Sequence, residues 1–438
     1  MNIILPIIFF LFFAWGVYKW SFFNIHGISR KFLLTAFFLK VLAGFLLTMI
    51  YTYHYDLRTE ADTFRYFDDS YYLHKAASEN PKAYLRMMFG IDDSKDLMPY
   101  LDSMNNWFPA ERTTFYNDNR TVIRINALIR WIPYSSYYVH MLIFCFMAFY
   151  GLTFIYKAFN KYFAGKKTWL GLILFFTPSI VFWSSGILKE GPLLLVFGIA
   201  LNILNKIFIK RAHWQHYTLL IFCFLFLFHL KFYVGLLLFP AITGYTWILK
   251  TKGPHPIIKI ILNFSAYFGV AVVWHLINWN WSLFTVLKWK RLDFIGLAES
   301  MNANSFITTG ELEDNPISFL QNFGWGFFNA ITRPFPWEVY SLVILPNAIE
   351  NILIIIFIVF CVIFGKIKNF QNIGYFFFIY AFGLLTIIGM VTPIMGSLVR
   401  YKTPAIPFLL MFFLLFLKKE KSKKILSIFN KNIFRPLE

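Results

Sequence analysis

Charge is scarce in this sequence, and negative charge is scarcest. Only 14% of the 438 residues are Asp, Glu, Lys or Arg, and only 22 are acidic. A soluble domain carries roughly 25% charged residues. In their place the chain has 58% hydrophobic residues, including 56 Phe, which is more apolar side chain than a water-soluble fold can bury. The composition therefore excludes an ordinary soluble domain and predicts a chain that lies largely in lipid.

Cysteine is also rare, and no segment is set apart by composition. The three cysteines, Cys145, Cys223 and Cys361, all fall inside apolar runs, which is typical of small core residues rather than of disulfides or Cys-based metal sites. The chain lacks a low-complexity linker, an internal repeat of 20–50 residues and a separable soluble domain. Residues 1–438 are therefore expected to form a single polytopic membrane domain.

Long apolar runs are what the sequence does have. A transmembrane helix needs about 20 mostly apolar residues, and eleven runs qualify, which predicts an all-α integral membrane fold with about eleven spans. The first run has neither a basic start nor a small-residue cleavage site, so we expect it to be retained. The runs are Ile3–Tyr18, Phe32–Tyr53, Tyr137–Phe159, Trp169–Gly186, Pro192–Ile209, Tyr217–Leu230, Phe232–Leu249, Pro256–Asn278, Ser341–Phe364, Phe370–Val391 and Thr403–Leu417.

The basic residues test this count. The net charge is +19, but the Lys and Arg form short clusters between apolar runs, as the positive-inside rule requires, and so do not favour nucleic acid as a partner. With eleven spans the clusters that carry most of the Lys and Arg fall on one side, which predicts an outer N-terminus and a cytoplasmic C-terminus. If Tyr217–Leu249 were one long tilted helix, the later clusters would lie outside. The basic tail 418–438 is then expected to rest on anionic membrane lipids.

Two large loops, 54–135 and 279–340, lie on the outer side in this topology and are expected to contain short helices. The first holds 12 of the 22 acidic residues. In a helix, Asp62, Tyr66 and Asp69 share one face, at spacings of four and three. A carboxylate there can act as a general base or bind a divalent cation. The alternative is an interfacial helix whose acids face water and whose aromatics lie among headgroups.

Further charges lie near the outer ends of the apolar runs. Arg124 precedes the third run, where Arg is suited to holding phosphate or can instead snorkel. Lys189 and Glu190 occupy a turn so short that they must lie at or below the membrane surface, and Lys231 lies in the next outer turn. Ionisable groups at that depth usually face a cavity or one another. A functional site and a structural ion pair both fit this pattern.

The second outer loop ends in Arg333-Pro-Phe-Pro-Trp-Glu338, where two prolines fix the backbone around the charges. Arg400 opens the final apolar run and can hold a diphosphate or a carboxylate, or simply anchor the chain at the interface. We expect the charges of these turns and loops to converge at one pocket that opens away from the cytosol.

Three segments, Pro178–Glu190, Arg333–Glu338 and Arg400–Pro407, resemble motifs of bacterial polytopic glycan-assembly enzymes. The chain resembles in particular the GT-C-type glycosyltransferases, in which an acidic residue follows an early helix as Asp62 does here, and the O-antigen or exopolysaccharide polymerases. The resemblance implies a bacterial inner membrane, an outward-facing site and a polyprenyl-phosphate-linked sugar. In GT-C members the Asp deprotonates the acceptor or helps to bind a divalent cation.

We therefore expect a membrane glycosyltransferase or polysaccharide polymerase, with the following assignments. The acids Asp62, Asp69 and Glu338 are the catalytic candidates. The substrate-binding candidates are Arg124, Lys189, Glu190, Lys231, Arg333 and Arg400. A transporter or flippase for a lipid-linked glycan, working without catalysis, is the alternative. Large outer loops and the lack of an internal repeat favour the enzyme.

Overall fold

The protein is an all-α membrane protein. Its computed structural model describes residues 3–54, 57–90, 95–107, 118–253, 255–300, 305–307, 310–339 and 344–418, and over these ranges the only β contacts are two isolated bridges. Seven helices in this part are long and apolar enough to cross a membrane, or eight if a pair bent by 60° counts as one span. The seven are α2 (Arg30–His54), α7 (Tyr137–Phe159), α10 (Glu190–Phe208), α11 (Trp214–Leu236), α13 (Pro256–Ile277), α16 (Leu345–Ile363) and α17 (Ile373–Val391), and the bent pair is α18 (Met395–Tyr401) with α19 (Ile406–Phe416).

The other expected spans coincide with shorter helices. These are α1 (Ile4–Lys19), α8 (Lys167–Phe176) with α9 (Pro178–Trp183), and α12 (Leu238–Lys250). Pro178 explains one of these breaks, because proline lacks an N–H and drives the preceding Thr177 into an extended conformation with ψ near 120°. Length and composition alone thus support fewer than eleven spans, and the eleven-span topology stays a prediction.

The chain forms two compact units. Of the described residues, the first unit contains those of 3–161 and 181–232, and the second contains those of 162–180 and 233–418. The remaining α-helices are α3 (Asp62–Glu79), α4 (Pro81–Phe89), α5 (Met98–Leu101), α6 (Asp118–Ile129), α14 (Leu283–Ser300) and α15 (Pro316–Thr332), and the 3-10 turns are η1 (Ser21–Phe23), η2 (Arg58–Glu60), η3 (Lys95–Leu97), η5 (Asn160–Phe163), η6 (Trp279–Trp281), η7 (Pro336–Glu338) and η8 (Ile367–Asn369).

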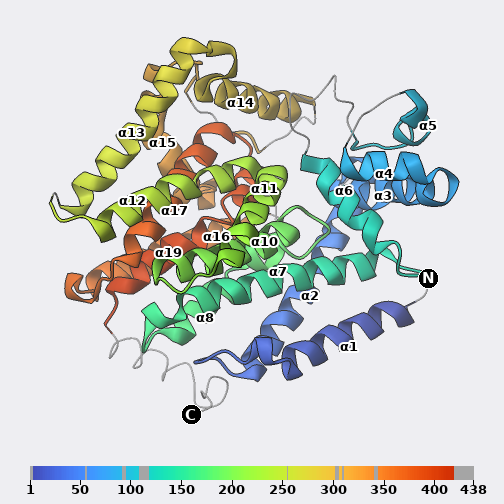
Figure 1. Cartoon of the computed structure of the whole chain (residues 1–438), viewed down its shortest axis with the longest axis horizontal. Coiled ribbons are helices and arrows are strands. Elements are labelled where there is room, and N and C mark those ends of the chain that lie inside the picture. Colours follow the sequence, from blue (N-terminus) through green and yellow to red (C-terminus); the bar gives the residue numbers. More distant parts are fainter. Residues whose placement is uncertain are drawn as a thin grey trace. The chain divides into compact units, whose positions relative to one another are not determined.

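In the first unit, α7 packs closely along α10, and α1 and α2 lie against α7 (Figure 1). The close approach depends on Gly151 and Gly198, since a Cβ on either would overlap the backbone of the opposing helix. The short helices α3 to α6 pack on one another as a separate group, with α3 contacting both α4 and α6. We call this group the outer helix cluster.

In the second unit, α15 packs along α17, where Gly326 and Gly389 let the two backbones meet. Phe284 and Phe294 of α14, Phe319 of α15 and Met390 of α17 form a buried core beside this contact. The bend between α18 and α19 interrupts an apolar segment of this unit. Another apolar helix, α11, is broken within the first unit. The break in α11 is at Lys231, whose φ of −154° and ψ of 93° are not helical. It divides α11 at the boundary that separates two of the expected spans.

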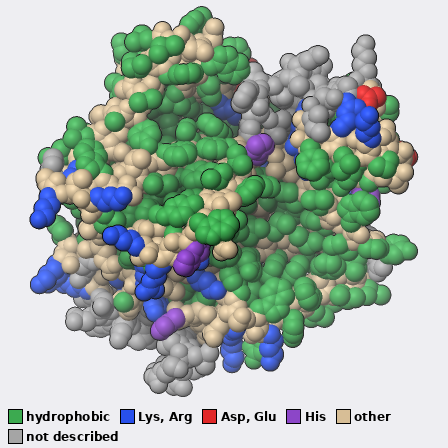
Figure 2. All heavy atoms as spheres, viewed as in Figure 1, with side chains coloured by type: hydrophobic (Ala, Val, Ile, Leu, Met, Phe, Trp, Pro, Cys, Tyr) green, Lys and Arg blue, Asp and Glu red, His purple; other side chains and the backbone are tan. Residues whose placement is uncertain are grey.

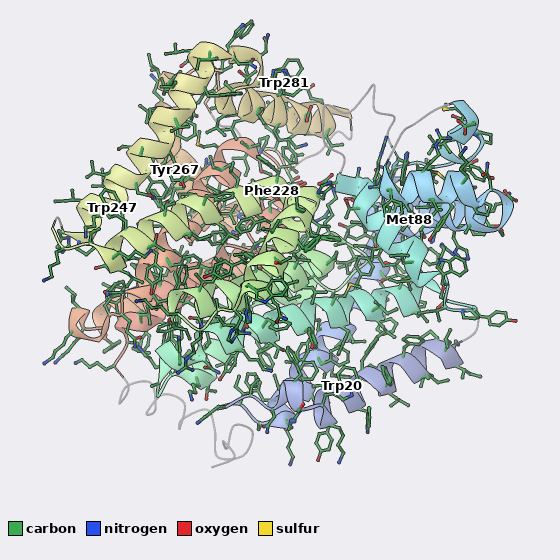
Figure 3. All side chains as sticks on the ribbon, viewed as in Figure 1. Trp20, Met88, Phe228, Trp247, Tyr267 and Trp281 are labelled. Atoms are coloured by element: carbon green, nitrogen blue, oxygen red, sulfur yellow. The ribbon has the colours of Figure 1, made fainter. Side chains whose placement is uncertain are left out.

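The helix surfaces suit lipid. Hydrophobic side chains cover most of the helix surface visible in Figure 2, while Lys, Arg and His occur in small separate groups. Exposed aromatic side chains such as Tyr267 on α13 and Trp281 in the turn after it project outward (Figure 3). Exposed apolar surface on this scale would be unfavourable in water and is favourable in a bilayer.

Candidate functional site

The acidic face predicted for the first outer loop exists as part of α3, but its members have different surroundings. Asp62 is the first residue of α3 and is half-buried. Asp69 is completely buried, and its two carboxylate oxygens accept the backbone N–H groups of Asn105 and Asn106 at 2.8 and 2.6 Å. Burial raises the pKa of Asp69 to about 6, and the two N–H donors offset part of that rise. Asp69 therefore anchors the segment after α5 to α3.

Arg124 also holds the outer helix cluster together. Its Nε donates to the carbonyl of Met87 at 2.9 Å, and its guanidinium lies 5.0 Å from the ring centre of Trp107. Arg120 lies 4.9 Å from the same ring, so two cations flank one indole. Arg124, which was predicted to bind phosphate, thus contributes to the packing of α4 against α6.

Lys189, Glu190 and Lys231 do come together in the first unit. Lys231 Nζ lies 2.7 Å from Glu190 Oε1, and these side chains are only 2% and 1% exposed. Lys189 Nζ lies 2.6 Å from Asp118 Oδ2 at the start of α6. The break in α11 places Lys231 opposite the first turn of α10, where the carboxylate also favours the helix N-terminus. Sequence reasoning missed Asp118, whose ion pair with Lys189 connects the turn before α10 to α6 of the outer helix cluster.

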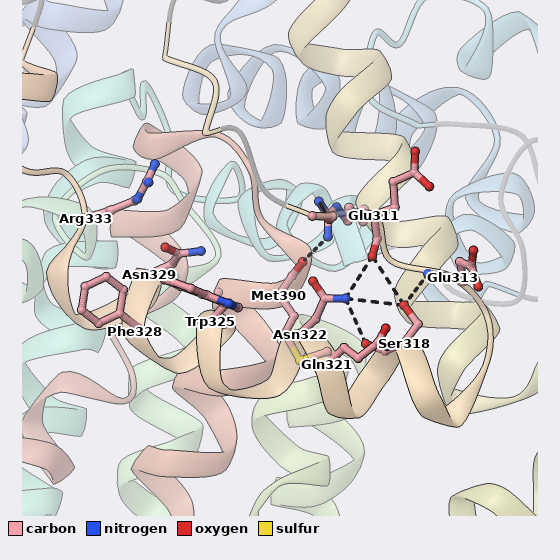
Figure 4. A pocket seen from close by; sticks show the side chains of 14 residues that line it. Glu311, Glu313, Ser318, Gln321, Asn322, Trp325, Phe328, Asn329, Arg333 and Met390 are labelled. Carbon is pink, nitrogen blue, oxygen red and sulfur yellow. Dashed lines mark hydrogen bonds between the residues drawn. The ribbon is translucent and has the colours of Figure 1, made fainter.

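The second unit contains a cavity of about 610 Å³ along one side of α15 (Figure 4). Most of its lining is polar or aromatic, with backbone from glycines where helices approach. The lining residues are Arg291, Gly310, Glu311, Glu313, Ser318, Gln321, Asn322, Trp325, Gly326, Phe328, Asn329, Arg333, Gly389 and Met390. This volume lies in the usual range of about 300–1,000 Å³ for small-molecule sites.

One end of the cavity is built by Arg291 and by the segment that precedes α15. Arg291 Nη2 donates to the Gly310 carbonyl at 2.5 Å, and burial lowers the pKa of this guanidinium. Asn322 Nδ2 donates to the Glu311 carbonyl at 2.9 Å, and the N–H of Glu313 donates to Ser318 Oγ at 2.9 Å (Figure 4). These bonds fix the acidic segment beside the helix, while the Glu311 and Glu313 side chains stay exposed.

The other end contains Arg333, which forms an ion pair with Glu338, a second predicted site residue. Arg333 Nη1 lies 3.0 Å from Glu338 Oε1, and Glu338 Oε2 accepts the N–H of Phe335 at 2.9 Å. Asn329, one helical turn before Arg333, is buried. Trp325 and Phe328 are exposed at the rim, 67% and 45% respectively. Arg333 Nε has no hydrogen-bond partner among the described residues.

Arg400 is buried in α18, and it is not among the described residues that line the cavity. Lys402, two residues later, is the cation that contacts the Arg333 loop, with Nζ 3.2 Å from the Arg333 carbonyl. Sequence reasoning missed Lys402 and also Arg291, which lies in a basic run typical of a solvated face. The signal for Lys402 was its position inside an apolar stretch.

Five of the nine predicted site residues thus fall into two groups, one in each unit. The first contains Lys189, Glu190 and Lys231, and the second contains Arg333 and Glu338. Where the chain is described, no three His, Cys, Asp or Glu residues are arranged to hold a metal ion. Asp92 and Asp93, two of the acidic residues of the loop 54–135, lie outside the described residues. The divalent cation expected at the first outer loop stays a prediction.

Comparison with known proteins adds no relative. No protein-family model, no curated protein and no solved structure matches this chain.

Proposed function

We propose that the protein is a membrane glycosyltransferase or polysaccharide polymerase that uses a polyprenyl-phosphate-linked sugar. The observation that carries the proposal is the cavity beside α15, which combines guanidinium groups, side-chain amides and rim aromatics. Guanidinium groups recognise phosphate. Amides can exchange hydrogen bonds with sugar hydroxyls, because they both donate and accept. Aromatic faces offer flat apolar surfaces to sugar rings.

In this proposal the two ends of the cavity have different tasks. Arg333 holds the phosphate of the donor, with Glu338 orienting the guanidinium at 3.0 Å. Gln321, Asn322 and Asn329 bind hydroxyls of the sugar. Reaction transfers the sugar from its phosphate to an acceptor hydroxyl, whose proton passes to a carboxylate acting as general base. Glu311 and Glu313, whose exposed side chains line the cavity, are the candidates for that base, and Arg333 beside the leaving phosphate stabilises its developing charge. The catalytic role expected for Asp62, which belongs to the first unit, stays a prediction.

The proposal includes the topology predicted from the sequence. Eleven spans place both large loops and the cavity on the extracytoplasmic face of a bacterial inner membrane, with the N-terminus outside and the C-terminus in the cytoplasm. Basic clusters between the apolar runs support this orientation.

A transporter or flippase for a lipid-linked glycan is the second candidate. The observation in its favour is the pair of broken helices, α11 at Lys231 and α18 with α19. Discontinuous helices with buried charge at the break are typical of transporter binding sites.

The test uses membrane vesicles loaded with radiolabelled polyprenyl-linked sugar. Transfer to glycan should require Arg333 and fall strongly in Arg333→Gln and in the double variant Glu311→Gln with Glu313→Gln. The exposed Lys290→Gln, which is not a cavity-lining residue, serves as the control. Movement of a fluorescent lipid-linked sugar across the bilayer without any transfer would support the second candidate and end the first.

A further inference from the structure

The C-terminal end of α15 is held by two side chains from distant parts of the second unit. Lys402 Nζ donates to the carbonyls of Ala330 and Arg333 at 3.1 and 3.2 Å. Asn351 Nδ2 donates to the carbonyls of Thr332 and Pro334, both at 3.2 Å. Four carbonyls at and just beyond the end of this helix are thus bound from α16 and from the bend after α18, and the two within the helix, of Ala330 and Thr332, are among those normally left without an intrahelical partner. We call Lys402 and Asn351 the carbonyl clamp.

Every side-chain N–H donor of the clamp forms a hydrogen bond, and both side chains are buried. Lys402 also donates to Asn351 Oδ1 at 2.7 Å, so all three of its N–H bonds are used, as are both amide N–H bonds of Asn351. The two side chains are 1% and 2% exposed. Glu350, next to Asn351, interacts electrostatically with Lys402, while its carboxylate accepts the N–H and hydroxyl of Ser179 at 2.9 and 2.7 Å. A fully buried, fully bonded polar network fixes one backbone geometry.

What the clamp fixes is the backbone of Arg333, the cation at one end of the cavity. A helix C-terminus carries roughly half a negative charge on its terminal carbonyls. At this end of the cavity that charge would oppose an anionic ligand. The ammonium of Lys402 neutralises it and at the same time sets the direction in which the Arg333 side chain leaves the helix.

We propose that the carbonyl clamp positions Arg333 and offsets the negative helix end so that this end of the cavity binds a phosphate-type anion. The inference rests on the proposed function, since it names the anionic part of the same substrate. It assigns to Lys402 and Asn351 a role in positioning, because neither lines the cavity.

The chain supplies a matched control in Lys166. Lys166 is also buried in the second unit, and its Nζ donates to the carbonyls of Leu414, Leu415 and Leu417 at 2.9, 2.9 and 3.0 Å. It therefore binds the end of α19 just as Lys402 binds the end of α15. Lys166 is not a cavity residue. Its removal should disturb folding in the same way without touching the anion site.

The experiment measures binding of inorganic pyrophosphate to the detergent-solubilised full chain by calorimetry. Wild type should bind in a manner that requires Arg333. Lys402→Met and Asn351→Leu should each weaken binding by about tenfold or more, equivalent to losing one good charge-assisted contact. Lys402→Arg should restore part of the affinity, and Lys166→Met should leave it unchanged at a comparable loss of Tm.

Equal weakening in Lys166→Met and Lys402→Met would overturn the inference, and so would full affinity in Lys402→Met or wild-type binding independent of Arg333. The proposed function fails separately. Arg333-dependent pyrophosphate binding without sugar transfer in vesicles would retain the clamp and reject the glycosyltransferase. Sugar transfer that persists in Lys402→Met with unchanged pyrophosphate affinity would retain the glycosyltransferase and reject the clamp.

Discussion

Two buried lysines show two ways of holding charge in this protein. Lys231 lies at the break in α11 and meets a carboxylate directly, with Glu190 at 2.7 Å. Lys402 lies at the bend after α18 and is surrounded by two carbonyls and an amide oxygen. In the first site a full opposite charge lies directly against the ammonium, whereas in the second the direct partners are dipoles and Glu350 acts on the ammonium electrostatically. Losing a directly paired charge costs more than losing one dipole, so removal of the carboxylate should destabilise the first site more.

Glu190→Gln should have the largest effect. It leaves the Lys231 ammonium buried without its carboxylate, and removing one partner of a buried pair costs about 3–5 kcal/mol. Thermal unfolding in detergent should show the loss as a large fall in Tm. The double variant with Lys231→Met should recover most of it, because the pair is then replaced by neutral groups. A double variant as unstable as Glu190→Gln alone would show that the pair is not the source of the fragility.

The contrast between the two lysines also explains what sequence could predict. Apolar runs predicted the helices because hydropathy is a local property, and the meeting of Lys189, Glu190 and Lys231 followed from the shortness of their turns. Arg400 and Lys402 are both buried, and the bend between α18 and α19 decides which of them contacts the Arg333 loop. The sequence pointed to Arg400, whereas Lys402 makes the contact. Contacts with backbone carbonyls cannot be predicted from composition, because every residue has a backbone carbonyl.

The same limit applies to the outer helix cluster and to the cavity. The partners of Asp69 are backbone N–H groups 36 and 37 residues away in an irregular segment, and no periodicity indicates such a contact. Arg291 belongs to a basic run with Lys288 and Lys290, and only the packing of α14 shows that it alone is buried. Sequence therefore identified charged segments but not which member of each is enclosed.

A packing variant tests whether the site around Lys402 depends on the contact between α15 and α17. Gly389→Ala places a Cβ against the Gly326 carbonyl, and overpacking of this kind costs about 1–3 kcal/mol. Because α15 carries the carbonyls that Lys402 holds, pyrophosphate affinity should fall together with Tm. Gly324 lies on α15 and has open space around its Cβ position. Gly324→Ala should therefore stabilise α15 by about 0.5–1 kcal/mol. Equal behaviour of the two variants would mean that α15 does not rest on α17 through its glycines.

Glu350→Gln sharpens the comparison directly. It removes the carboxylate nearest Lys402 but keeps an oxygen for Ser179, and Lys402 retains its three acceptors. We expect a loss of about 1–2 kcal/mol, near that of a hydrogen bond to a charged group and well below that of Glu190→Gln. Chemical or thermal unfolding of both variants under one set of conditions provides the measurement. A larger loss for Glu350→Gln than for Glu190→Gln would show that Lys402 depends on its nearby carboxylate more than Lys231 does.

Asp69 extends the comparison to a negative charge held by dipoles and should give the smallest effect. Its folded-state pKa of about 6 lies above the ordinary value of 3.8, with burial as the largest cause, although Arg65 and two N–H donors act the other way and Asp68 adds to the rise. The folded protein thus binds this proton more tightly than the unfolded chain, so its stability falls as the pH rises through 6. Between pH 5 and pH 7 the loss should be about 1 kcal/mol.

The measurement is hydrogen exchange across α3 and the 103–107 segment at the two pH values. Asp69→Asn removes the titrating group and keeps one acceptor oxygen for the two N–H donors, so the difference between the proteins isolates Asp69 from His74, whose pKa is lowered by burial on the same helix. Protection that rises toward pH 7 in wild type would mean that the two N–H bonds outweigh burial. Asp69 would then be a stably ionised anchor, held directly by N–H dipoles in the first unit much as Lys402 is held directly by carbonyl dipoles in the second.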